Sequence, residues 1–370
     1  MTLRGLFFLI LITAIARPAW GWNRSDHQLM TRLALEEVAH EWGLDRPVEV
    51  RPLQSFLEKF SSGEQIDPWH FAEALKINTK IDLERTYPPL TGRKEATPLE
   101  ILSIYSIDPD DGRDQDLFVR DKKGNRRYAY PDQKWFGSMT GGNSQAFRHI
   151  EKPPFDWRHP ICTFGFPPWK VGEASERAQL YVDLSQEAFS LGEDYWGWRF
   201  LGNALHYLED LHQPYNAGQI TLGLVATGLK GWLTWGWKEG FMATMAHLVA
   251  NSHRFFESYI AGSATPSLKG AALEALRETD HPPLPDSVEA LAIQIRDVSN
   301  RFFPDLIAAV TTATGSSLKG SYAFRADDPP VDDPEKFLKK GPGFEKASQR
   351  IFEITRDRFA SAGRVIRTTV

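Results

Sequence analysis

The sequence is poor in cysteine, with Cys162 as the single cysteine among its 370 residues. No intrachain disulfide can form, so stability must come from a hydrophobic core or from bound metal. A large excess of positive charge is missing too, because 43 Lys and Arg stand against 48 Asp and Glu, for a formal net charge of -5. This balance argues against a protein held on nucleic acid by a general basic surface, but it leaves room for an enzyme that grips a few phosphates through metal ions.

Internal repeats, low-complexity tracts and strong alternation of apolar and polar residues are also missing. What the chain does have is 42% hydrophobic and 12% aromatic residues, enough to bury one large core. Apolar residues recur mainly at the spacing of helices. We therefore predict an all-α fold, with one multi-helix domain over residues 22–370 that has long loops.

The first 21 residues have the pattern of a secretory signal peptide. A positive charge precedes an apolar run from Gly5 to Ala16 that is too short to span a bilayer comfortably. Ala19 and Gly21 are small residues placed for a cut that would leave Trp22 as the mature N-terminus. We predict a secreted or periplasmic protein, with a retained membrane anchor as the alternative.

Helix-like spacing predicts helices from Ser25 onward, partly over 55–77, over 173–191, 194–212 and 240–262, and again in the C-terminal third. Between them, residues 84–175 are rich in Pro, Gly and Asp and are predicted to form long loops, with a short hairpin at Lys123-Gly124-Asn125. Loops of this length are usually functional or held in place by a specific interaction, and a bound metal ion can provide that interaction.

Two pairs of ligand-type residues have the same spacing: His206 with Asp210, and His253 with Glu257. Four residues turn a helix by about 400°, so both members of a pair leave the same face. One such pair is ordinary on a helix surface. Two pairs inside apolar helices, where unpaired charge is costly, favour metal binding.

The segment LGNALHYLEDLHQP, around His206 and Asp210, resembles the core motif of the zinc-dependent phospholipase C and fungal single-strand nuclease superfamily. In that family the mature chain starts with a tryptophan whose α-amino and carbonyl groups bind zinc, and a histidine ligand follows shortly after. Trp22 and His27 match this arrangement. The match requires signal cleavage, because an amide nitrogen cannot bind metal as a free amine does.

The resemblance implies two or three Zn²⁺ ions. The first ion would be held by Asp110, His149, His206 and Asp210, the second by Trp22, His27 and a bridging Asp210, and the third by His253, Glu257 and the residue at 216. That residue is Asn216 where the family has histidine, and an amide oxygen is a poor zinc ligand. Several substitutes stay open: Asp108, Asp111 or Asp114 for Asp110, His70 for His149, and His212 or His247 to complete the third set.

The resemblance also implies hydrolysis of a phosphate ester, with zinc lowering the pKa of a bound water and Asp110 orienting or deprotonating that water. A non-catalytic, zinc-stabilised binding protein is the alternative from another class, and Asn216 is the residue that favours it.

Residues 217–250 are the main clue to the substrate, because they are apolar and glycine-rich with Trp232, Trp235 and Trp237 close together. Their charged residues disfavour a transmembrane span, and tryptophans beside lysines suit a bilayer interface. A buried hairpin, or base stacking in a nuclease, would use the same residues. We expect a phospholipid substrate with peripheral membrane contact through 217–250, nucleic acid less so, and no protein partner.

Overall fold

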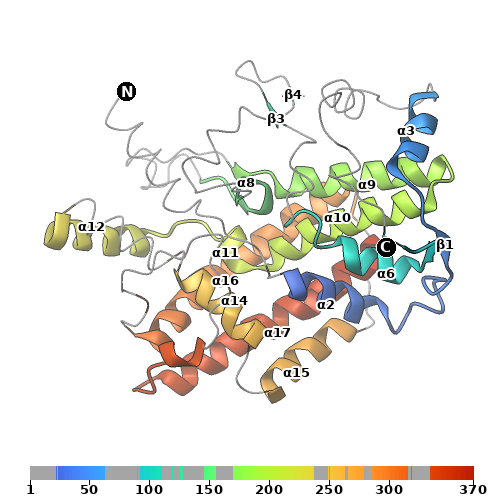
Figure 1. The fold of residues 1–370 in the computed structure, drawn as a ribbon. Helices are drawn as coiled ribbons and strands as arrows, with labels where there is room; N and C mark the ends of the chain where they lie inside the picture. Colours follow the sequence, from blue (N-terminus) through green and yellow to red (C-terminus); the bar gives the residue numbers. More distant parts are fainter. Residues whose placement is uncertain are drawn as a thin grey trace.

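The computed structural model describes residues 22, 24–62, 90, 92–110, 119–120, 126–127, 146–155, 170–236, 249, 251–262, 266–278, 283, 285–315, 318 and 334–370. Over these residues the fold is all-α in character, as predicted, with long helices and a few short strands (Figure 1). The predicted signal peptide, its cleavage bond and Cys162 lie outside the described residues.

The N-terminal half supplies short helices and two-residue strands: α2 (Arg24–Leu35), β1 (Val48–Glu49), α3 (Leu53–Ser62), β2 (Glu95–Ala96), α6 (Pro98–Tyr105), β3 (Val119–Arg120), β4 (Arg126–Arg127), α8 (Ala146–His149), β5 (Glu151–Lys152) and β6 (Val171–Gly172). The strands pair antiparallel as β1 with β2, β3 with β4 and β5 with β6. The predicted turn at residues 123–125, between β3 and β4, lies outside the described residues.

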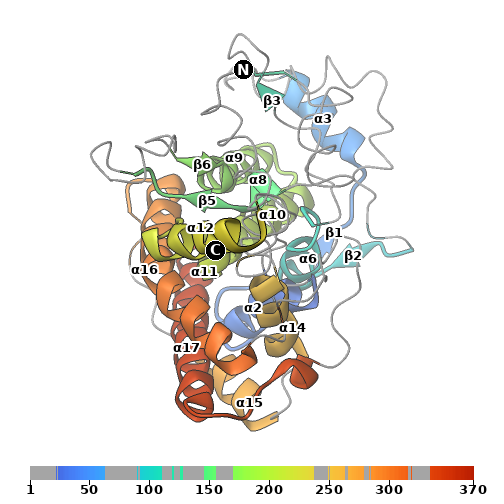
Figure 2. The ribbon, with the colours of Figure 1, turned by 90° about the vertical axis from the view of Figure 1, so that its left-hand side faces the viewer.

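The C-terminal half supplies most of the long helices: α9 (Ala174–Ser190), α10 (Asp194–His212), α11 (Pro214–Ala217), α12 (Leu222–Gly236), α14 (Ser252–Gly262), α15 (Pro266–Glu274), the 3-10 turn η5 (Ala275–Arg277), α16 (Val288–Thr314), the 3-10 turn η7 (Pro334–Phe337) and α17 (Phe344–Thr369). The helices α9 and α10 pack against each other, and α16 packs along α17 (Figures 1 and 2).

Helix α10 is the central element, and it is almost wholly buried. It packs on α9, α6, α16 and α17. Gly202 lets α6 come close, since a Cβ there would lie only 3.1 Å from the carbonyl oxygen of Leu102. The helix ends at His212, and the next residue, Gln213, has the extended backbone that fits the position before Pro214. Its bounds agree with the predicted 194–212.

One prediction about local structure is wrong. The sequence predicts loops over residues 84–175, but the structure contains α6 there, started by a capping box in which Thr97 and Glu100 satisfy each other's backbone N–H groups, with Pro98 in the first turn. The short α8 also lies in this stretch. The helix predicted from Ser25 onward is α2, which ends at Leu35 and is followed by turns.

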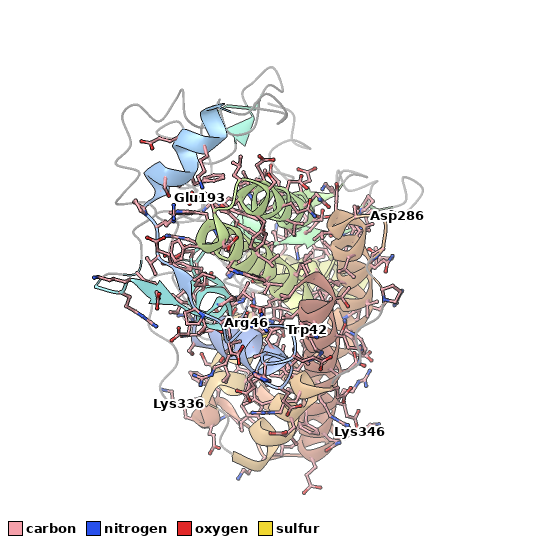
Figure 3. All side chains as sticks on the ribbon, turned by 90° about the vertical axis from the view of Figure 1, so that its right-hand side faces the viewer. Trp42, Arg46, Glu193, Asp286, Lys336 and Lys346 are labelled. Carbon is pink, nitrogen blue, oxygen red and sulfur yellow. The ribbon has the colours of Figure 1, made fainter. Side chains whose placement is uncertain are left out.

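A buried carboxylate ties the N-terminal part to α10. Glu193, labelled in Figure 3 at the start of α10, lies 2.6 Å from Nζ of Lys59 and accepts a hydrogen bond of 3.0 Å from Ser55, both on α3. At the other end of the chain, Arg367 of α17 donates to the carbonyl oxygens of Ala34 and Leu276. These contacts hold α2, α3 and α17 around α10. Over the described residues, none of the helices combines the length and apolar character needed to cross a membrane.

Candidate metal centre

Helix α10 brings its first ligand pair together as the spacing predicts. Nε2 of His206 lies 3.1 Å from Oδ2 of Asp210, and both side chains are fully buried. The Nδ1–H group of His206 donates to the carbonyl oxygen of Ser106 at 2.6 Å, just after α6. This contact fixes the ring with Nε2 facing Asp210, which is how a ligating histidine is usually held.

His149 and Asp110 join this pair from segments far away in the sequence. Nδ1 of His149, at the end of α8, lies 2.7 Å from Oδ2 of Asp210 and 2.8 Å from Nε2 of His206. One carboxylate oxygen of Asp110 lies 3.8 Å from His206 and 3.9 Å from His149. The set implied for the first ion therefore converges in space.

His27 reaches the same place from α2. Its Nε2 lies 3.5 Å from Oδ1 of Asp210, and its ring centroid is 4.0 Å from that of His206. Two groups of possible ligand atoms result, each with its atoms within 4.8 Å of one another: His27, Asp110 and His206, and His149, His206 and Asp210. We call the residues His27, Asp110, His149, His206 and Asp210 the His–Asp cluster.

The polar atoms of the cluster are those that a cation would satisfy. Both carboxylate oxygens of Asp110 are buried without a hydrogen-bond partner in the described part of the chain, and so is Nε2 of His27. A buried, unpaired carboxylate is costly, and such groups normally pair or coordinate metal. Imidazole nitrogens with carboxylate oxygens are a ligand set that zinc and other divalent ions accept. The residues therefore fit a metal centre, although they leave the identity of the metal open.

The pKa values of the cluster follow from burial and close contact. Burial raises the pKa of the Asp110 carboxyl above its ordinary value. Burial acts in the same direction on Asp210, but His206 and His149 outweigh it and hold the pKa of Asp210 well below its usual range. Burial lowers the pKa of His27, yet its contacts with neighbouring acids raise that pKa overall. A proton on Asp110 or His27 would therefore compete with a cation for the same ligand atom.

Sequence reasoning missed Glu209, which is fully buried behind the cluster. The Nδ1–H group of His27 donates to Glu209 at 2.6 Å, and the hydroxyl of Thr31 donates to its other oxygen at 2.7 Å. The carboxylate therefore turns Nε2 of His27 toward Asp210. The signal that could have found it is an acidic residue next to Asp210 within an apolar helix, where unpaired charge is costly.

The structure separates Asp110 from its nearest rival. Asp108 forms a fully buried pair with Arg199, whose Nη2 donates to it at 3.0 Å. The guanidinium also stacks between Tyr105 and Trp196, at 4.0 and 4.8 Å from their ring centroids. Asp108 is therefore engaged by α10 and is not part of the cluster. Four more predicted substitutes lie outside the described residues: Asp111, Asp114, His70 and His247.

Trp22 lies beside the cluster through its side chain. The indole is fully buried against Phe359 and Phe256, with ring centroids 4.9 and 5.9 Å away. Its Nε1–H donates to the carbonyl oxygen of Glu209 at 3.0 Å. The residue predicted as the mature N-terminus thus contacts the helix that carries His206 and Asp210.

The set implied for a third ion is only partly assembled. Nε2 of His253 lies 2.8 Å from Glu257 on α14, and the His253 ring stacks on Tyr215. Asn216 instead points its amide nitrogen at Asp210, 3.2 Å from the backbone oxygen and 3.4 Å from Oδ1. Among the described His, Cys, Asp and Glu residues, no third group completes a set with this pair.

His212, also predicted as a possible member of that set, points elsewhere. Its Nδ1–H donates to the carbonyl oxygen of Leu208 at 2.7 Å, and its Nε2 lies 3.1 Å from the hydroxyl of Ser361 on α17. Burial lowers the pKa of His212 to about 3, so the ring is neutral. Through these contacts it packs α10 onto α17.

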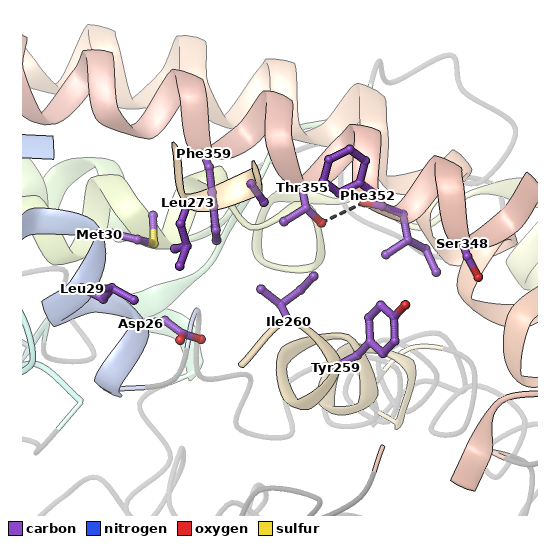
Figure 4. A pocket seen from close by; sticks show the side chains of 12 residues that line it. Asp26, Leu29, Met30, Tyr259, Ile260, Leu273, Ser348, Phe352, Thr355 and Phe359 are labelled. Carbon is purple, nitrogen blue, oxygen red and sulfur yellow. Dashed lines mark hydrogen bonds between the residues drawn. The ribbon is translucent and has the colours of Figure 1, made fainter. Parts of the chain in front are cut away.

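A pocket near the cluster has a different character. It lies between α2, α14, α15 and α17 and is lined mainly by apolar side chains such as Leu29, Ile260, Leu273 and Phe359 (Figure 4). None of the cluster residues lines it. The pocket is therefore separate from the His–Asp cluster in its lining residues.

Comparison with known proteins adds no further constraint: no family model matches the chain, and no curated protein or solved structure is significantly similar to it.

Proposed function

We propose that the protein is an exported, zinc-dependent phosphoric ester hydrolase of phospholipase C type. The observation that carries the proposal is the buried carboxylate of Asp110, which lies beside His149 and His206 and has no hydrogen-bond partner in the part of the chain that the structure describes. The motif around His206 and Asp210 adds the family resemblance, which suggests zinc and a phosphodiester substrate.

Some residues of the site would bind the metal ions, and others orient the histidines that bind them. Asp110, His149, His206 and Asp210 would hold one ion, and His27 with Asp210 and the freed N-terminus of Trp22 would hold a second. Zinc bound there supplies a Lewis acid that lowers the pKa of a bound water and neutralises charge on a phosphoryl oxygen. Asp110 would orient or deprotonate the attacking water, because both of its carboxylate oxygens are buried without a hydrogen-bond partner in the described part of the chain.

Glu209 and Ser106 position the histidines before substrate arrives. Each accepts the Nδ1–H of one ring, His27 and His206 respectively, so neither histidine has to reorient during the reaction. The fully buried cluster also keeps bulk water away from the reacting groups.

The substrate we favour is a phospholipid. The net charge of -5 offers little general attraction for nucleic acid, and residues 217–250 suit a lipid interface better than a polyanion.

The test is metal analysis of the purified mature protein, followed by parallel assays on phosphatidylcholine and on single-stranded DNA. We expect two zinc ions per chain, an N-terminus at Trp22, and release of phosphocholine that stops with chelator and returns with zinc. Cleavage of the DNA alone would favour the nuclease. A single metal with neither activity would refute an enzyme and leave a zinc-stabilised binding protein.

A further inference from the structure

Helix α12 carries an exposed apolar face. Among residues whose exposure the structure describes, the exposed large hydrophobic side chains are Leu222, Trp232 and Leu233, at 44%, 43% and 86%, and all belong to this helix. Leu222, Ala226 and Leu233 are exposed and share one side of the helix by their spacing, and Leu229 between them is partly buried against the core. A soluble surface seldom gathers its exposed apolar residues on one element without a function.

The charge on this helix is of one sign. Lys230 is the only charged residue in the sequence of α12, and it is exposed beside the apolar side. Leucine and tryptophan next to lysine, without acidic residues in the helix, is the composition of a helix that lies in the interface of a phospholipid bilayer. The positive charge suits lipid phosphates, in a protein whose net charge is otherwise negative.

The base of α12 is firmly held. Lys152 donates to the carbonyl oxygen of Gly218 at 2.6 Å. The backbone N–H of the next residue, Gln219, donates to the side-chain oxygen of Asn300 at 2.7 Å. The side-chain amide of Gln219 donates to the carbonyl oxygen of Pro153, also at 2.7 Å. These contacts fix where the helix leaves the body.

Close packing reinforces this anchor. A Cβ at Gly218 would lie 2.1 Å from the ring of Phe303, so only glycine allows the backbone this near to α16. Beyond the anchor, α12 extends away from the helical body in Figure 1 and faces the viewer in Figure 2. The helix α12 therefore projects from the body, and the segment at Gly218 and Gln219 that precedes it is fixed in place.

The segment that anchors α12 follows closely on a residue that contacts the His–Asp cluster. Asn216, whose amide contacts Asp210 of the cluster, belongs to α11, and α12 begins at Leu222 shortly after it. A surface bound by α12 would therefore be held in a set relation to Asp210.

We propose that α12 is a docking arm that inserts its Leu222–Leu233 side into the surface of a phospholipid bilayer and so holds the protein at a surface that carries lipid phosphates. The proposal rests on the proposed function for its purpose, but not for the binding itself. A second copy of the chain covering the same side is the competing occupant.

The test uses sedimentation of the full-length mature protein with vesicles of phosphatidylcholine and phosphatidylglycerol. The double variant Leu222→Ser/Leu233→Ser should lower the partition coefficient at least about tenfold, because each leucine loses most of its apolar transfer free energy. The matched control is Thr227→Ser/Thr234→Ser on the same helix, which keeps the hydroxyls that bond to the helix backbone and should bind as wild type does. Equal binding by the two double variants would overturn the proposal.

Two further measurements separate this proposal from the proposed function. Hydrolysis of a short-chain phosphatidylcholine, kept monomeric in solution, should be unchanged in the leucine variant while hydrolysis of vesicles falls. Hydrolysis of monomers by a protein that binds no vesicles would refute the arm and keep the enzyme, whereas leucine-dependent binding without any hydrolysis would keep the arm and refute the enzyme. If light scattering shows a dimer that only the leucine variant breaks, the occupant is a second copy and the proposal is wrong. Should the double variant misfold, Leu233→Ser alone, at the most exposed position, should still lower the partition coefficient several-fold.

Discussion

The Nδ1–H group of His27 donates to Oε2 of Glu209 at 2.6 Å, joining a histidine on α2 to an acid on α10. Glu209 occupies the position before Asp210, whose own carboxylate faces the opposite ring nitrogen of His27 at 3.5 Å. Two consecutive acidic residues of one helix therefore hold the two nitrogens of one imidazole. One acid sets the direction of the ring, and the other shares the space where a cation would bind.

We predict that Glu209→Ala lowers the metal affinity about 10- to 100-fold, because the ring of His27 loses the acceptor that orients it. Glu209→Gln should recover part of this loss, since its amide oxygen can still accept from His27. The measurement is competition with a chromophoric zinc chelator at fixed pH. Asp183→Asn, an exposed change on α9, is the control for removing one negative charge. Equal affinities for Glu209→Ala and the control would contradict the orienting role.

Asp108 and Asp110 should respond in opposite ways to the same substitution. Asp108→Asn breaks a fully buried ion pair with Arg199, and we expect a loss of about 3–5 kcal/mol in the free energy of unfolding. Asp110→Asn removes a buried charge that has no hydrogen-bond partner in the described structure, so the metal-free protein should be at least as stable as wild type.

Urea unfolding with excess chelator measures both effects, and metal titration of the folded variants completes the comparison. Asp110→Asn should bind metal far more weakly, while Asp108→Asn, where it folds, should keep the wild-type affinity. The opposite pattern would show that the ligand had been assigned to the wrong aspartate.

The sequence could predict those parts of this site that depend on local spacing. The bounds of α10 and the facing of His206 and Asp210 follow from apolar periodicity, from the position of Gln213 before Pro214, and from a spacing of four residues. The helix α6 could also be predicted from the sequence, because the capping box at Thr97 and Glu100 is a local signal. The surrounding Pro and Gly residues instead favour the prediction of a loop.

Contacts between distant segments could not be predicted in this way. No spacing rule brings His27, Asp110 and His149 to Asp210, and only the family resemblance suggested that they meet. The pairing of Asp108 with Arg199, and of Glu209 with Thr31, depends on how α6 and α2 pack on α10. Tertiary packing decides which of several neighbouring acidic residues faces the candidate metal site. The local sequence around those residues does not reveal this choice.

Asn216 gives a third prediction. Its amide donates to Asp210, so we expect it to orient Asp210 rather than bind a third ion with His253 and Glu257. Asn216→Ala should leave the count of tightly bound zinc at two per chain and weaken their affinity about threefold to tenfold. Elemental analysis of the dialysed protein gives the count. His253→Gln is the control and should change neither the count nor the affinity, whereas a drop in the count would show that α14 holds an ion after all.

Lys152 makes the stability of the protein depend on pH. Burial lowers the pKa of its ammonium group to about 7, from 10.5 in an unfolded chain. Between these values the unfolded chain binds more protons than the folded protein, so the contribution of Lys152 to the free energy of unfolding rises with pH through this window. The rise cannot exceed about 1.4 kcal/mol per pH unit, because one proton is involved.

Lys152→Met should remove this rise, because methionine fills much of the same apolar space without a titrating group. The measurement is the free energy of unfolding of wild type minus that of the variant. This difference should increase as the pH rises from about 7 to about 10. Below this window the difference should be constant, since lysine is then protonated in both states. Lys59→Met is the control for replacing a lysine by methionine at a partly exposed site, where the ammonium group contacts Glu193. A flat difference for Lys152→Met would mean that the Lys152 ammonium stays charged in the fold, held by the carbonyl oxygens of Tyr215 and Gly218.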